Sequence, residues 1–262
     1  MFRWCSYCQN LIGETEPLDD YRISHGICVK CSKDPEADSS ESKLLRARLI
    51  FEMLEEAGRG GSLDACKQVI DEALDFGLKP SDIAVGILHP ILYQIGEMWE
   101  RGEITVANEH RFTVFALGLI DQLQFPEPPG QRPLILLANH PESGHEIGLR
   151  VLQLLSWERG IPCQRLPVGT TAQTLLDAAG ECESILFGLS VGLVEHIPAA
   201  LELARTIADR LPDDCTLVLG GQAFRRSGHD GISDGMTVLK TIDEFTARLD
   251  SINNEHFRTR TL

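Results

Sequence analysis

Four cysteines near the start of the chain have the spacing of metal ligands. Two Cys-x-x-Cys pairs stand 19 residues apart, namely Cys5 with Cys8 and Cys28 with Cys31. Four thiolates around one zinc ion would supply the folding free energy that so short a segment cannot gain from a core of its own. The spacing therefore predicts a zinc ribbon over residues 1–35, with the four cysteines as ligands. His25, just before the second pair, is an alternative fourth ligand.

A histidine, a serine and a pair of glycines follow short apolar segments in the second half of the chain. His145 comes after residues 134–138, Ser190 directly follows residues 185–189, and Gly220-Gly221 ends the segment that begins at residue 216. A loop histidine can ligate a metal, and glycine lets a bulky ligand approach the backbone closely. Each signal is weak alone, so their value depends on where the fold places them.

The segment from residue 132 to 250 alternates predicted strands with predicted helices. The strands cover residues 134–138, 163–166, 185–189, 216–219 and 237–239, and the helices cover 145–159, 172–179, 197–210 and a last segment near the end. Such alternation predicts an α/β domain with a doubly wound parallel sheet. Ligands of such sheets bind beyond the carboxyl ends of the strands, which is where these polar residues and glycines lie.

Together, the spacings resemble the cobalamin-binding domain of methionine synthase and its relatives. That family has the pattern D-x-H-x-x-G, about forty residues, S-x-L, about 27 residues, and G-G. Here 41 residues separate Gly148 from Ser190, and 27 separate Gly192 from Gly220. The resemblance implies a Rossmann-like, flavodoxin-like cobalamin-binding domain over residues 132–250 in which the benzimidazole base is released from cobalt.

The resemblance also implies roles for individual residues. His145 would ligate cobalt from below, Ser190 would bond the released base, and Gly220 and Gly221 would line the slot for the nucleotide tail. The same loops contribute the other predicted cofactor-binding residues: Gly144, Gly148, Val191 and Gly192. Two positions depart from the pattern. Ser143 replaces the aspartate that orients the histidine, and Gly192 replaces the leucine of S-x-L.

Residues 42–124 are predicted to form a four-helix bundle, with apolar positions at helical spacing. Pro90 lies inside the third helical segment and should kink it. At the junction of the third and fourth segments, nine residues separate Trp99 from Glu109-His110. This pattern resembles the cap of light-sensing cobalamin-binding regulators of the CarH and AerR type. In that family Trp99 would pack on an upper ligand such as adenosyl. Glu109 and His110 would bond its ribose or replace it.

Composition limits the choice of partners. The 262 residues carry 39 acidic and 24 basic side chains, a net charge of -15. This charge argues against direct binding to nucleic acid or to anionic membranes, and no apolar run is long enough to span a bilayer. The first residues contain no signal sequence. We therefore expect a cytoplasmic protein that contacts a protein partner, such as a transcriptional regulator, or itself.

The predicted function is that of a non-enzymatic, light-responsive regulator that binds zinc and cobalamin. Adenosylcobalamin is the expected form, with methylcobalamin and hydroxocobalamin as alternatives. Glu100 stands where CarH proteins have a histidine that binds cobalt after photolysis, so His110 is the candidate for that role. The main alternative is a corrinoid carrier subunit of a methyltransferase system. A cobalamin chaperone, or an adaptor that has lost cobalamin, is a third possibility.

Overall fold

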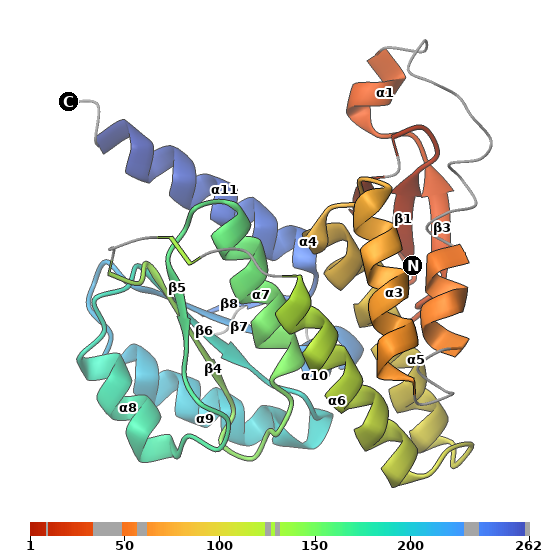
Figure 1. Ribbon diagram of the computed structural model, residues 1–262. Helices are drawn as coiled ribbons and strands as arrows, with labels where there is room; N and C mark the ends of the chain where they lie inside the picture. Colours follow the sequence, from red (N-terminus) through yellow and green to blue (C-terminus); the bar gives the residue numbers. More distant parts are fainter. Residues whose placement is uncertain are drawn as a thin grey trace. The chain divides into compact units, whose positions relative to one another are not determined.

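The computed structural model describes residues 1–8, 10–33, 49–56, 62–123, 127–128, 132–227 and 236–259. The chain divides into two compact units, residues 1–124 and 125–262 (Figure 1). The stretch that leads from the predicted ribbon to the helix at residues 49–56, residues 34–48, lies outside the described residues. Among the described helices, none has the length and apolar character needed to cross a membrane.

The first unit begins with a small three-stranded sheet. Its central strand β1 (Phe2–Cys5) pairs antiparallel with β2 (Leu11–Glu14) and parallel with β3 (Ile23–Gly26), and helix α1 (Val29–Lys33) follows. Phe2 and Trp4 are buried while Arg3 between them is exposed, which is the alternation expected of a half-buried strand. Of the four cysteines of the predicted ribbon, Cys5 ends β1, Cys8 lies in the loop after it, Cys28 lies between β3 and α1, and Cys31 lies in α1.

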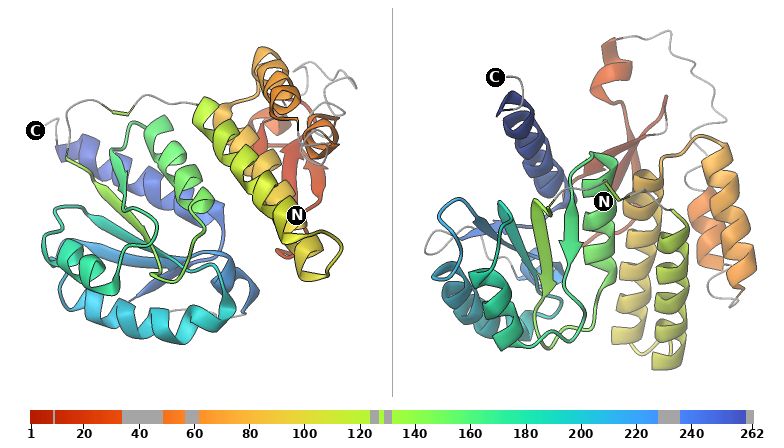
Figure 2. Two further views of the ribbon diagram at one scale, coloured as in Figure 1. Left: turned by 60° about the horizontal axis from the view of Figure 1, so that its bottom comes forward. Right: turned by 60° about the vertical axis from the view of Figure 1, so that its left-hand side comes forward.

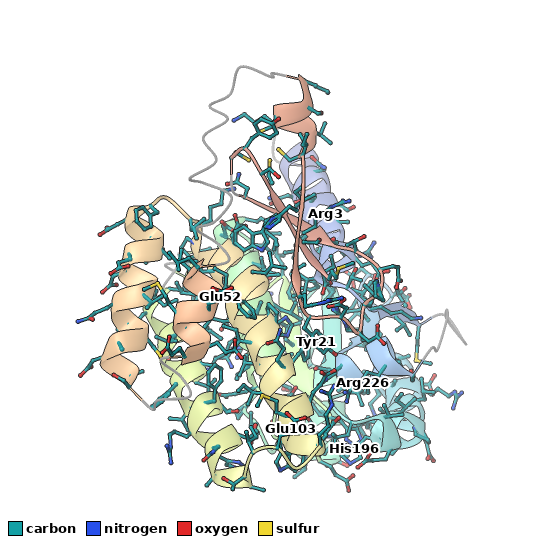
Figure 3. All side chains as sticks on the ribbon, turned by 90° about the vertical axis from the view of Figure 1, so that its right-hand side faces the viewer. Arg3, Tyr21, Glu52, Glu103, His196 and Arg226 are labelled. Carbon is teal, nitrogen blue, oxygen red and sulfur yellow. The ribbon has the colours of Figure 1, made fainter. Side chains whose placement is uncertain are left out.

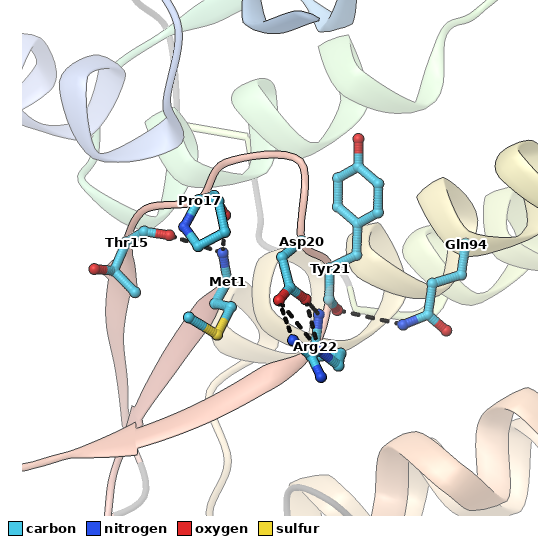
Figure 4. Close-up of polar contacts among 7 residues, drawn as sticks. All are labelled: Met1, Thr15, Pro17, Asp20, Tyr21, Arg22 and Gln94. Carbon is cyan, nitrogen blue, oxygen red and sulfur yellow. Dashed lines mark hydrogen bonds and ion pairs between the residues drawn. The ribbon is translucent and has the colours of Figure 1, made fainter.

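The small sheet packs directly on the helices of the same unit. A Cβ on Gly86 would meet the indole ring of Trp4, so the absence of a side chain at residue 86 lets the ring lie against the helix backbone. Leu11 N–H donates to the Asp82 carboxylate at 3.2 Å, and the Gln94 side chain donates to the Tyr21 carbonyl at 3.4 Å (Figure 4). The ribbon and the helices therefore form one packed body.

The chain end is fixed within this sheet as well. The Met1 ammonium group donates to the carbonyls of Thr15 and Pro17 at 2.7 Å each, and Arg22 forms a forked ion pair with Asp20 (Figure 4). Hydrogen bonds from Arg22 lower the pKa of the Asp20 carboxyl to about 2. These contacts hold the loop between β2 and β3 in place.

Capping side chains and glycines mark the ends of several helices in the first unit. Residues 49–56 are helical, and the later elements are α3 (Leu63–Asp75), α4 (Pro80–Ile83), a π-helical turn η1 (Ala84–Leu88), α5 (His89–Glu100) and α6 (Val106–Gln122). Ser62 and Thr105 cap α3 and α6 with their side-chain oxygens. Gly77 and Gly102 follow α3 and α5 with φ of +82° and +71°, which favours glycine.

The predicted kink at Pro90 takes the form of a π-helical turn just before it. The helix runs without interruption from Pro80 to Glu100, and in η1 the His89 N–H bonds the carbonyl of Ala84, five residues back. Proline lacks an N–H and its ring crowds the preceding turn, and widening that turn by one residue relieves the crowding.

The second unit contains a parallel sheet of five strands among the described residues, in the order β5-β4-β6-β7-β8. The strands are β4 (Ile135–Asn139), β5 (Cys163–Arg165), β6 (Leu186–Ser190), β7 (Thr216–Gly220) and β8 (Thr237–Leu239). The helices are α7 (Ile147–Glu158), α8 (Ala172–Gly180), α9 (Ile197–Ala208), α10 (Gln222–Arg226) and α11 (Ile242–Thr259). The central strands are almost wholly buried, as expected when helices cover both faces.

Helices α8 and α9 cover one face of this sheet, and α7 and α11 cover the other (Figure 2). On the first face, Leu136, Phe187 and Leu217 point into a core shared with Leu175 and Ile207 from the helices. The fold class predicted from the sequence, a mixed α/β chain with a doubly wound parallel sheet, is confirmed.

Candidate functional site

The strand order places a crevice at the carboxyl ends of β4 and β6. The chain leaves β4 toward β5 on one side and later returns to β6 on the other, so the two connections diverge between these strands. Asn139, Ser190 and Gly220 are register partners across β4, β6 and β7, and they end their strands side by side. The topology thus brings two of the predicted site residues to one edge, together with Asn139.

The loop after β4 holds buried polar atoms without partners. Among the described residues, the amide oxygen and nitrogen of Asn139 and the hydroxyl of Ser143 have no hydrogen-bond partner, although both residues are at most 5% exposed. Buried polar groups are nearly always paired in folded proteins, because an unpaired one costs about 1–3 kcal/mol. Such atoms at a sheet edge indicate a polar ligand or ordered water.

His145 lies in this loop and is exposed. A Cβ on Gly192 would lie 3.2 Å from His145 Nδ1 and 3.3 Å from Ser143 Oγ, so the imidazole and the hydroxyl both border the space that glycine leaves at residue 192. A side chain at residue 192 would have to displace the imidazole or the hydroxyl. The neighbouring carboxylates are engaged elsewhere, Glu142 at 3.4 Å from His196 and Glu146 at 2.8 Å from Arg150.

Ser190 and the glycine pair are packed against one another. Gly221 has φ of +103° and ψ of 173°, a conformation that is nearly restricted to glycine. A Cβ there would lie 2.8 Å from Val191 N and 3.0 Å from Ser190 Oγ. Val191 in turn bonds the carbonyl of Gly220 and the N–H of Ala223. The backbone at residues 190–192 and 220–221 is therefore tightly fitted, and a ligand can lie close to it.

The residues of the predicted cap lie in the first unit, at the end of α5 and the start of α6. The Trp99 side chain is 45% exposed, which is unusual for so large an apolar residue. Glu109 accepts a hydrogen bond from Thr113 at 2.9 Å and pairs with His110 Nδ1 at 2.9 Å. Val106 and Val114, one helical turn before and after His110, are 54% and 64% exposed. A partly apolar stripe thus faces outward on α6.

The four predicted zinc ligands come together in the first unit. One sulfur from each of Cys5, Cys8, Cys28 and Cys31 lies within 4.8 Å of the others, which makes the cluster a candidate metal site. Burial would raise the pKa of the Cys5 thiol, but the N–H groups of Cys28, Cys8 and Tyr7 lower it to about 6. Burial and the neighbouring thiols raise the pKa of Cys31 to about 12. A cation would offset this repulsion between sulfurs, and the tetrathiolate set suits zinc.

Residues 50–124 match the family model of the B12 binding domain. Over 224 residues the chain is 27% identical to the HTH-type transcriptional repressor CarH of Myxococcus xanthus, covering 77% of this chain and 74% of the repressor. These matches confirm the resemblance to CarH-type cobalamin-binding proteins. The fold is similar to that of the monomethylamine corrinoid protein of Methanosarcina barkeri, with a TM-score of 0.62, 18% identity, and coverage of 78% of this chain and 99% of that one.

The residues of the second unit fit a cobalamin. His145 is an exposed imidazole beside a space bounded by Gly192, and the unpartnered atoms of Asn139 and Ser143 can bond a ligand rich in amide groups. At Gly221 the backbone of the loop after β7 packs directly on that of Val191, so no side chain of residue 221 stands between the backbone and a ligand. The match to the B12 binding domain covers Trp99, Glu109 and His110 in the first unit.

Three residues of this edge were missed by the motif. Asn139 and His140 precede the motif at the end of β4, and His196 follows Ser190 by six residues. His140 is 5% exposed, and its ring stacks on that of His196 at 5.2 Å between centroids. Burial, and then the charge of His196, lowers the pKa of His140. Polar residues directly after the predicted strand at 134–138 could have indicated Asn139 and His140, whereas His196 stands too far from its strand for a local signal.

Proposed function

We propose that this protein is a cobalamin-binding, light-responsive regulator that acts through protein contacts and catalyses no reaction. The observation that carries the proposal is that one chain holds both the cap motif and the strand-end motif. The similarity to the CarH repressor extends over 77% of the chain and thus includes residues of both units. The half-exposed Trp99 supports the proposed cap, because a cap needs an apolar surface that the protein itself leaves uncovered.

In this proposal the second unit would hold the cofactor at the carboxyl edge of its parallel sheet. His145 would bind the cobalt through an imidazole nitrogen, and Ser190 would hydrogen-bond the benzimidazole base. Ser143 borders the same space as His145, and its hydroxyl, which has no hydrogen-bond partner among the described residues, would be available to orient the imidazole in place of the family aspartate. The bound group itself supplies a cobalt–carbon bond that light can break.

The cap residues of the first unit respond to loss of the upper ligand. Trp99 supplies the apolar surface, and the Glu109–His110 pair supplies an acceptor and an imidazole on the following helix. Trp99 would give an upper ligand an apolar surface to pack on, and loss of that packing would change the free energy of the cap. A protein partner, or a second copy of the chain, would detect that change as a shift between two arrangements.

The N-terminal ribbon and the charge favour a protein as the partner. The ribbon carries few basic residues, and the net charge of -15 opposes contact with phosphates. The ribbon packs on the cap helices through Trp4 and Gly86, so a partner bound to it would be sensitive to the position of those helices. We place this regulator in the cytoplasm, where thiols such as these stay reduced.

The test uses the full chain loaded with adenosylcobalamin in the dark. We expect its absorption bands and its elution volume on size exclusion both to change after green light. Trp99→Ala should keep the bound cofactor but lose the change in elution volume. Indifference of both readouts to light would overturn the proposal.

The same sample distinguishes the second candidate, a corrinoid carrier for methyl transfer. The fold similarity covers nearly the whole of a corrinoid protein, which makes this candidate worth testing. A carrier would accept a methyl group from a donor in the presence of a methyltransferase and a reductive activator, and would show no light-dependent assembly. A regulator would show the reverse.

A further inference from the structure

His140, Glu142 and His196 form a cluster of potential metal ligands in the second unit. His140 directly follows β4, and Glu142 lies two residues further on in the same loop. His196 ends the short 3-10 helix η2 (Val194–His196), in the loop after β6, and is labelled in Figure 3. One ligand atom from each of the three side chains lies within 4.8 Å of the others.

The distances within the cluster suit a single ion. His196 Nε2 and Glu142 Oε2 are 3.4 Å apart. Two ligands of a tetrahedral zinc ion, each about 2.0–2.1 Å from the metal, are separated by roughly 3.3 Å. The two imidazole rings are 5.2 Å apart between centroids, with an angle of 28° between their planes. With all three ligand atoms within 4.8 Å of one another, small side-chain adjustments would bring them around one ion.

Both histidines of the cluster are largely buried. His140 is 5% exposed, and the His196 side chain is 17% exposed. An ion pair between His196 Nε2 and Glu142 does not account for the burial of a second imidazole beside the first. A bound cation would engage both rings.

We propose that His140, Glu142 and His196 bind a divalent transition-metal ion, zinc foremost, at the carboxyl edge of the parallel sheet. Two imidazoles and one carboxylate are a donor set typical of zinc sites with three protein ligands. Such a site keeps its fourth position for water or for an atom of a bound molecule. The proposed site includes neither His145 nor any residue of the four-cysteine cluster.

The position of the site links it to the cofactor crevice. The N–H of His140 donates to the carbonyl of Ser190 at 2.8 Å, so the residue that carries one metal ligand is hydrogen-bonded to a predicted cofactor-binding residue. A metal ion that fixes His140 therefore also restrains the end of β6. The metal site stands without the proposed function, since it can be tested in protein that contains no cobalamin.

The test counts zinc in the full chain, prepared without cobalamin and separated from excess metal by gel filtration. Elemental mass spectrometry should find two zinc ions per chain in the wild type and one in His196→Ala. His110→Ala is the matched control, because His110 also pairs with a glutamate but belongs to neither ligand cluster in the part of the chain that the structure describes, and the variant should keep both ions. Cobalt(II) identifies the sites, since thiolate charge-transfer absorption arises only from the cysteine cluster.

A second variant guards against loss of folding in His196→Ala. The Glu142 side chain is 71% exposed, so Glu142→Gln leaves the core intact, and circular dichroism should be unchanged. It should weaken the second zinc site by at least about tenfold, because changes around metal ligands commonly cost 10–100-fold in affinity. One zinc per chain in the wild type, or unaltered zinc affinity in Glu142→Gln, would overturn the proposal.

Discussion

Replacing Gly221 by alanine should destabilise the second unit much more than an ordinary glycine substitution. Gly221 has φ of +103° and ψ of 173°, and a side chain in this region costs about 1–3 kcal/mol. The new Cβ would also lie 2.8 Å from Val191 N, whereas ordinary contact begins at 3.4 Å, so Val191 must move by more than half an ångström. That movement disturbs the hydrogen bonds of Val191 to Gly220 and Ala223, each worth about 0.5–1.5 kcal/mol.

The expected loss in the free energy of unfolding is therefore about 2–6 kcal/mol. Gly160→Ala is the matched control. Gly160 also has positive φ, +70°, but a Cβ there meets nothing within 4 Å, and it lies between α7 and β5, away from the carboxyl edge. Its cost should be limited to the backbone strain, about 1–2 kcal/mol.

Urea denaturation of both variants, followed by circular dichroism, measures the two losses. Cobalamin titration of the same samples should show weaker binding in Gly221→Ala, because the shift of Val191 displaces Ser190 as well. Gly160→Ala should bind as the wild type does. Equal stability losses in the two variants would refute the argument that the close backbone contact at Gly221 defines this edge of the site.

Three further changes test other parts of the structure. Gly86→Ala should destabilise the first unit by about 1–3 kcal/mol, because the new Cβ meets the Trp4 ring. Its control, Gly96→Ala, has open space around the new Cβ and should stabilise the unit by up to about 1 kcal/mol. Equal effects of the two substitutions in urea denaturation would contradict the packing of Trp4 on Gly86. Cys31→Ser should remove one zinc ion per chain and lower the thermal midpoint, and unchanged zinc content would contradict the ribbon. In urea denaturation Trp99→Ala should cost the apoprotein about 1–3 kcal/mol, because nearly half of the residue is already exposed, and a loss above that range would show that the ring serves the core.

The parallel sheet could be predicted closely because its strands are short apolar runs bounded by polar residues and glycine. The predicted strand over residues 185–189 corresponds to β6 at Leu186–Ser190, and the predicted strand over 237–239 coincides with β8. Parallel strands buried on both faces leave a strong local signal of this kind. The order of the strands, which places Asn139 beside Ser190, depends on tertiary contacts and could not be derived from local patterns.

Contacts between distant segments account for what the sequence did not reveal. The packing of Trp4 on Gly86 joins residues 82 positions apart, and nothing in either segment predicts the other. The π-helical turn before Pro90 is one of several ways to relieve the crowding of a proline, so only the disturbance itself was predictable. The stack of His140 on His196 likewise depends on two loops that meet only because β4 and β6 are neighbours.

The most direct test of the central claim, that the strand-end histidine holds cobalamin in this chain, is electron paramagnetic resonance of the cob(II)alamin-loaded protein. Full-length protein labelled with ¹⁵N only in histidine should show doublet splitting from the nitrogen bound to cobalt, and the unlabelled protein should show a triplet. His145→Ala should remove the doublet from the labelled sample. A triplet in the labelled wild type would mean that the cofactor keeps its own base on cobalt, and would contradict the role of His145.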